Sequence, residues 1–189
     1  MPSVIAMPPG TPYCHPLQDL ALIKGKFKGS ILVVGSGPSA RENVPWINAV
    51  HIPRMLCSGG HYADGYLPFE FVWVSDSFWL QRKFPIKPST VLITRGLIAD
   101  PLDQLKVCGL NWYHWLDHVK LEMYSGPAAI RGAMYLGFET VYYIGMDGGA
   151  DPYLGIDYFS SKLQVEEIKR EFPGIVLPWT EMTNGRHPH

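Results

Sequence analysis

The sequence predicts a single α/β domain in which helices cover both faces of one doubly wound, mostly parallel sheet. Short apolar runs alternate with segments of helical character from Ser30 onward. The runs are apolar at nearly every position, which is typical of strands that are buried on both faces. Several runs end in glycine or small polar residues, as strands do at the ligand-binding edge of such a sheet.

Composition supports a globular protein and excludes several functional classes. The 189 residues suffice for one buried core, and 47% are hydrophobic while 17% are charged. The net charge of −1 argues against a broad basic surface for nucleic acid or membranes. We find no signal peptide and no run of the ~18 apolar residues that a membrane span needs. Three separated cysteines match no metal or redox spacing, so we expect a cytoplasmic protein.

The first elements follow from local patterns. Residues 1–25 are rich in proline and lack periodicity, which predicts a surface arm before a domain over residues 26–189. SILVVG (residues 30–35) is the first expected strand. A short helix is expected around Ala40–Ala49.

The middle of the chain contains three further strand patterns. They are RMLCSG (54–59), FEFVWVSD (69–76) and STVLITRG (89–96), with the helical segments SFWLQRKF and PLDQLKVCG after the second and third. LNWYHWLDH (110–118) is ambiguous and fits a strand that leads into a loop. The aromatic residues of this region are expected in the core and over the sheet: Phe69, Phe71, Trp73, Phe78 and Trp79.

The last third alternates helix and strand twice. SGPAAIRGAMYLGF (125–138) predicts a helix with a narrow face of small residues, and TVYYIGMDGG (140–149) a strand. SSKLQVEEIKREF (160–172) is amphipathic, with Leu163, Ile168 and Phe172 expected on its buried face. GIVLPW is the last expected strand.

The segment GSGPS after the first strand suits a strand–turn–helix junction of a Rossmann-like fold. Gly35 and Gly37 allow positive φ and close approach of a ligand, and Pro38 suits a first helical turn. Exposed N–H groups there favour an anion such as a phosphate. A purely structural turn fits equally well, because the run matches neither the dinucleotide-binding fingerprint nor a P-loop.

A second such segment is YSGPAAIRGAMYLGFETVYYIGMDGG, residues 124–149. Ser125 is the expected N-cap of its helix, whose first N–H groups offer a second anion site. Asp147 ends the following strand, where a carboxylate can meet a ribose, a sugar hydroxyl or a cation.

The order of these two segments resembles that of the bacterial lipooligosaccharide sialyltransferases. The resemblance rests on GSGPS, on SG at the start of a small-residue helix, and on LGF-x-x-(V/I)-Y-x-x-G-(M/I)-D, and it extends roughly over Ser30–Asn184. The flagellin-modification Maf proteins and the archaeal hydroxymethylpterin diphosphokinase group are wider relatives. The resemblance implies a transferase that uses a nucleotide donor, most simply a glycosyltransferase with a CMP-sugar.

The resemblance also implies a set of site residues. Those that would contact the nucleotide are Gly35, Ser36, Gly37, Pro38, Ser39, Ser58, Gly59, Ser75, Asp76, Tyr124, Ser125 and Gly126. Asp147 and Tyr158 would be catalytic, with Tyr158 bracing a leaving phosphate. The family's long lid with its catalytic histidine is here shortened to residues 148–161, which contain no histidine.

Two other functions fit the same residues. The short lid also fits a pyrophosphokinase-like enzyme that uses ATP, with Mg²⁺ on Asp147 and Asp151, and a non-catalytic nucleotide-binding module fits the missing histidine. We expect no fixed metal site, since His114 and His118 have helical spacing but lack an accompanying ligand pattern. Arg131 could neutralise a phosphate or form an ion pair. The acceptor is unknown, and the chain could assemble as a homo-oligomer.

Overall fold

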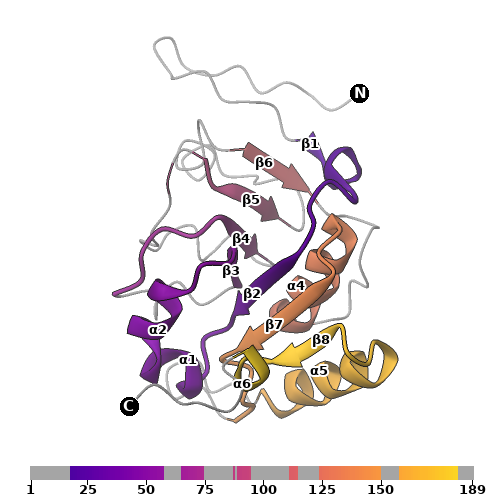
Figure 1. Ribbon diagram of the computed structural model, residues 1–189. Coiled ribbons are helices and arrows are strands. Elements are labelled where there is room, and N and C mark those ends of the chain that lie inside the picture. Colours follow the sequence, from indigo (N-terminus) through magenta and orange to yellow (C-terminus); the bar gives the residue numbers. More distant parts are fainter. Residues whose placement is uncertain are drawn as a thin grey trace.

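The computed structural model describes residues 18–57, 65–74, 87, 89–94, 111–114, 124–149 and 158–182 (Figure 1). Within these residues one sheet contains eight strands in the order β1-β6-β5-β4-β3-β2-β7-β8, and every neighbouring pair is parallel. The strands are β1 (Gln18–Asp19), β2 (Ser30–Val34), β3 (Arg54–Cys57), β4 (Phe71–Val74), β5 (Val91–Thr94), β6 (Asn111–His114), β7 (Thr140–Ile144) and β8 (Val176–Pro178). The prediction of an α/β fold with a parallel sheet is confirmed.

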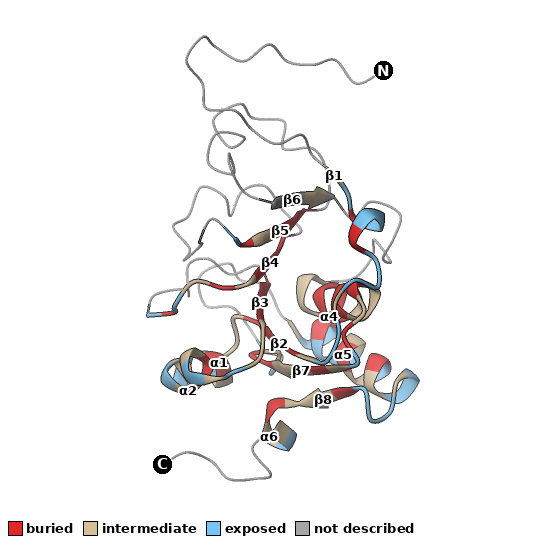
Figure 2. Ribbon diagram, turned by 45° about the horizontal axis from the view of Figure 1, so that its top comes forward, coloured by how far each residue is buried: buried red, intermediate tan, exposed pale blue. Residues whose placement is uncertain are grey.

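Helices lie on both sides of this sheet. They are the 3-10 helix η1 (Leu20–Ile23) and the α-helices α1 (Pro38–Glu42), α2 (Val44–Ala49), α4 (Ser125–Leu136), α5 (Phe159–Glu171) and α6 (Trp179–Met182). Figure 2 shows α1 and α2 on one side of the sheet and α4 and α5 on the other. No helix among the described residues is long and apolar enough to cross a membrane.

The central strand β2 supplies both cores. Ile31 and Val33 join the core beneath α4, whereas Leu32 and Val34 join the core beneath α1 and α2. Because successive side chains of a strand point to opposite faces, a strand that is buried on both faces must be apolar throughout. The uninterrupted apolar run that predicted this strand is therefore explained by its position.

Helix α4 lies close to the sheet because of its small residues. A Cβ on Gly132 would lie 2.0 Å from the ring of Trp73, so only glycine lets the helix rest against this indole. The helix ends at Gly137, whose φ of +108° accommodates a left-handed C-cap. The core position expected for Phe69, Phe71 and Trp73 is confirmed, while Phe78 and Trp79 lie outside the described residues.

Several elements differ from the sequence-based expectations. The helix expected over Ala40–Ala49 is two helices, α1 and α2, which meet at Asn43 because Pro45 begins a new first turn. Leu163 is 52% exposed, since the buried face of α5 runs through Ser161, Val165 and Ile168 instead. The end of the expected N-terminal arm joins the sheet as β1, and Leu20 behind it is fully buried.

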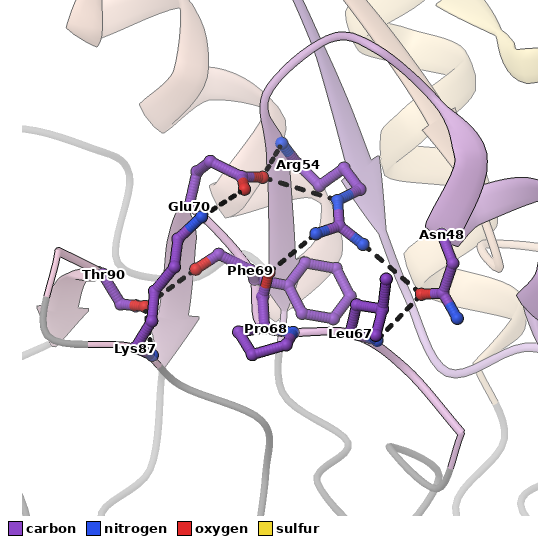
Figure 3. A network of polar contacts seen from close by, with 8 residues as sticks. All are labelled: Asn48, Arg54, Leu67, Pro68, Phe69, Glu70, Lys87 and Thr90. Carbon is purple, nitrogen blue, oxygen red and sulfur yellow. Dashed lines mark hydrogen bonds and ion pairs between the residues drawn. The ribbon is translucent and has the colours of Figure 1, made fainter.

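A polar network closes the amino-terminal ends of β3, β4 and β5 (Figure 3). Arg54 is 6% exposed; its guanidinium donates to the carbonyl of Pro68 at 2.7 Å and forms an ion pair with Glu70 at 3.4 Å. Lys87 forms a second ion pair with Glu70 at 2.7 Å. Asn48 accepts hydrogen bonds from the Arg54 guanidinium and from the N–H of Leu67.

Glu70 therefore holds a buried cation in place. Burial opposes its ionisation, but hydrogen bonds from Lys87 and Arg54 and the Arg54 charge outweigh burial and hold its pKa below the ordinary 4.5. A carboxyl with a lowered folded-state pKa stabilises the fold above its unfolded-state pKa. That contribution is lost as the pH falls through the folded-state value.

We predict that Glu70→Gln lowers the free energy of unfolding by about 1–3 kcal/mol at pH 7, because the buried Arg54 loses its counter-charge. Urea unfolding at pH 7 and pH 3 measures the effect. The difference from the native protein should shrink at pH 3, because the contribution of ionised Glu70 is lost as the pH falls toward its lowered folded-state pKa. Glu139→Gln, at an exposed carboxyl, is the matched control; an equal loss in both variants would contradict the prediction.

Candidate functional site

The candidate site lies at the carboxyl-terminal ends of β2 and β7, whose arrowheads lie side by side near α1 (Figure 1). The chain builds the sheet outward from β2 through β3, β4, β5 and β6, and then returns to place β7 on the other side of β2. The strand order reverses between these two strands. In parallel α/β sheets, ligands bind beyond the strand ends at this reversal.

Beyond the bond from the Gly35 N–H to the Ile144 carbonyl at 2.8 Å, three hydrogen bonds join the turn after β2 to the end of β7. The N–H of Gly37 donates to the carbonyl of Gly145 at 2.8 Å. The N–H of Gly145 donates to Ser39 Oγ at 2.9 Å, and the N–H of Ser39 donates to Asp147 Oδ2 at 2.9 Å. We call this set of bonds the β2–β7 interlock. It joins residues more than 100 positions apart in the sequence.

The glycines of the interlock are required for space. A Cβ on Gly35 would lie 2.4 Å from the Gly145 carbonyl oxygen, and a Cβ on Gly37 would lie 2.7 Å from the same atom. Gly37 has an ordinary φ of −67°, and Gly35 is not among the residues with positive φ, so the expected positive φ of these two glycines is wrong. Of the three, only Gly145, with φ of +75°, is left-handed.

Asp147 supplies the cap that α1 lacks in its own sequence. Gly37 occupies the N-cap position and has no side chain to accept from the helix, so the carboxylate at the end of β7 accepts from Ser39 instead. An N–H group expected to meet a phosphate is thus bonded to a carboxylate. A second negative charge about 4 Å away would cost ~1 kcal/mol in water and ~4 kcal/mol near a protein surface.

The start of α4 lies against the other side of β7's end. Tyr124 is the N-cap and Ser125 the first helical residue, so the expected N-cap role of Ser125 is wrong. The N–H of Tyr124 donates to Gln164 of α5 at 3.1 Å, while a Cβ on Gly126 would lie 3.1 Å from the sulfur of Met146. A Cβ on Gly35 would lie 3.3 Å from Met146 Cγ, so Met146 lies between the start of α4 and the turn after β2.

The start of α5 completes the site. The N–H of Tyr158 donates to the carbonyl of Gly149 at 2.9 Å, which anchors α5 to the segment after β7. The rings of Tyr158 and Tyr124 meet edge to face, with centroids 6.2 Å apart. The predicted residues from the turn after β2, the start of α4, Asp147 and Tyr158 thus surround the end of β7.

The remaining predicted residues either lie outside the described part of the chain or have other partners. Ser58, Gly59, Ser75, Asp76, Asp151 and His118 lie outside the described residues. Arg131 forms an ion pair with Glu171, so of its two expected roles the structure supports the ion pair. His114 lies in β6 rather than on a helix. No group of three potential metal ligands occurs among the described residues.

Sequence reasoning placed Gly145 and Met146 at a strand end that faces the crevice but gave neither a structural role, and it missed Gln164. The left-handed Gly145 between an apolar strand and an acidic residue was the available signal, whereas Gln164 carries none in the sequence.

Cys57 is fully buried; burial raises the pKa of its thiol to about 12, and the thiol donates to the carbonyl of Val34 at 3.3 Å. A neutral thiol of this kind is not a nucleophile.

Comparison with models of protein families, with curated proteins and with solved structures finds no significant match to this chain.

We predict that Gly37→Ala lowers the free energy of unfolding by about 1–3 kcal/mol, because the new methyl group would lie 2.5 Å from Asp147 Oδ2 and force the turn away from β7. Chemical unfolding measures the loss. Ser160→Ala, at an exposed position of α5, is the control. A Gly37→Ala variant as stable as this control would show that the two turns are not packed as described.

Proposed function

We propose that this chain is a transferase that uses a nucleotide donor, built as a Rossmann-like, doubly wound domain and acting in the cytoplasm. The observation that carries the proposal is the convergence of two glycine-containing turns at the reversal of strand order between β2 and β7. A sugar is the group whose transfer the motif resemblance favours, with a CMP-sugar as donor.

The chemistry follows from the groups that surround the end of β7. Departure of a nucleotide leaves negative charge on its phosphate, and donors fixed in advance stabilise such charge. The twelve-residue helix α4 presents the positive end of its dipole at Tyr124–Gly126, and the Tyr158 hydroxyl is a further donor nearby. Asp147 is exposed and can accept hydrogen bonds from hydroxyl groups of the donor.

A non-catalytic nucleotide-binding module is the second candidate. The observation that favours it is the capping of α1 by Asp147, which gives this carboxylate a structural role without any reaction. A pyrophosphokinase-like enzyme would instead need Mg²⁺ at Asp147. Nucleotide binding that survives EDTA favours the transferase over the pyrophosphokinase.

We predict that CMP, UDP, ATP or NAD raises the melting temperature of the full chain in a thermal-shift assay with and without Mg²⁺. A ligand at 100 times its Kd adds about 2.7 kcal/mol to the folded state, which corresponds to roughly 5–10 °C for a domain of this size. Turnover of the matching nucleotide-sugar then separates the transferase from the binding module. No shift with any of the four nucleotides would contradict the proposal.

A further inference from the structure

The carboxylate of Asp147 lies against the turn after β2. Asp147 Oδ2 lies 2.9 Å from the N–H of Ser39, and a Cβ on Gly37 would lie 2.5 Å from the same oxygen. The carboxylate fills the position that an anionic ligand would take against this turn. A phosphate at that position would have to displace Asp147 or lie beside a like charge.

Ser39 binds the segment that carries this carboxylate at two points. Its N–H binds Asp147 Oδ2, and its Oγ accepts from the N–H of Gly145, two residues earlier in the same segment. One half-buried serine therefore anchors both ends of the segment Gly145–Asp147. Among the described residues none donates to the second carboxylate oxygen, Oδ1, and Asp147 is exposed.

A carboxylate accepts hydrogen bonds but does not donate them, so the ligand group that meets Oδ1 must be a donor or a cation. A bound Mg²⁺ would take one or two carboxylates together with phosphate oxygens and water, and EDTA-sensitive nucleotide binding would identify it. Two adjacent hydroxyl groups of a sugar provide donors at the spacing of one carboxylate, without any other charged partner.

We propose that the turn after β2 selects the ribose hydroxyls of a nucleotide rather than its phosphate, with Ser39 as the positioning residue of Asp147. This inference rests on the proposed nucleotide binding and specifies which part of the nucleotide meets which turn. The β2–β7 interlock would then distinguish ribose from its deoxy forms. The phosphate would be bound by groups away from Asp147.

The test compares ATP with 2′,3′-dideoxy-ATP and CTP with 2′,3′-dideoxy-CTP by titration calorimetry on the full chain. We expect the native protein to bind a ribose form at least ~10-fold more tightly than its dideoxy form. Asp147→Asn keeps the size of the side chain and should bring this ratio close to one. Ser39→Ala should reduce the ratio, and Ser39→Thr, which retains the hydroxyl, should restore it. Circular dichroism verifies that each variant is folded.

Glu167→Gln and Ser160→Ala are the matched controls, because they remove a charge and a hydroxyl from exposed positions of α5 and should keep the native ratio. Equal binding of ribose and dideoxy forms by the native protein would overturn the inference and leave nucleotide binding intact. Binding of neither form would refute the proposed function and this inference with it. A native ratio in Ser39→Ala together with a lost ratio in Asp147→Asn would overturn the role of Ser39 alone.

Discussion

The hydrogen bond from the Ser39 N–H to the Asp147 carboxylate is the interaction on which the arrangement of the candidate site depends. It caps a five-residue helix that has no capping side chain of its own, and it fixes the end of β7 relative to β2. The glycines around it make the bond reachable, since any side chain at Gly35 or Gly37 would hold the two turns apart. The relative position of the two turns at this edge follows from it.

The two ends of the parallel strands differ in how their polar groups are bonded. At the amino-terminal edge the buried Arg54 forms an ion pair with Glu70. Arg54 also donates to the Pro68 carbonyl, and Glu70 also pairs with Lys87. The carboxyl-terminal edge instead presents an exposed carboxylate, an aromatic pair and the start of a long helix. The polar groups of the amino-terminal edge are bonded to one another, whereas the Asp147 carboxylate at the other edge is exposed to solvent.

Much of the fold could be predicted from the sequence because a strand that is buried on both faces of the sheet must be apolar at every position. The apolar run of β2 and the small residues of α4 identify their elements, since each residue type is required by what it touches. Boundaries were harder. The break at Asn43 depends on the capping geometry of two short helices. Strand β1 pairs with β6 over only two residues, and no local sequence pattern predicts it.

The sequence predicted that the two turns lie at the same edge of the sheet, but not how they contact each other. The glycine turn and Asp147 were recognised separately, and their mutual hydrogen bond could not be read from residues 108 positions apart. The glycines were expected to serve conformation or a ligand, whereas they serve the approach of two backbone segments. The role of Ser125 was misplaced by one residue because the backbone of Tyr124, rather than a capping side chain, begins α4.

Amide hydrogen exchange of the ligand-free protein, followed residue by residue by NMR, tests the interlock most directly. The account predicts slow exchange at Gly37, Ser39 and Gly145, whose N–H groups all have partners across the two turns. In Asp147→Ala the Ser39 amide should exchange much faster while the amides of β2 stay protected. Exchange of the Ser39 amide at the rate of an exposed turn in the native protein would contradict the central claim.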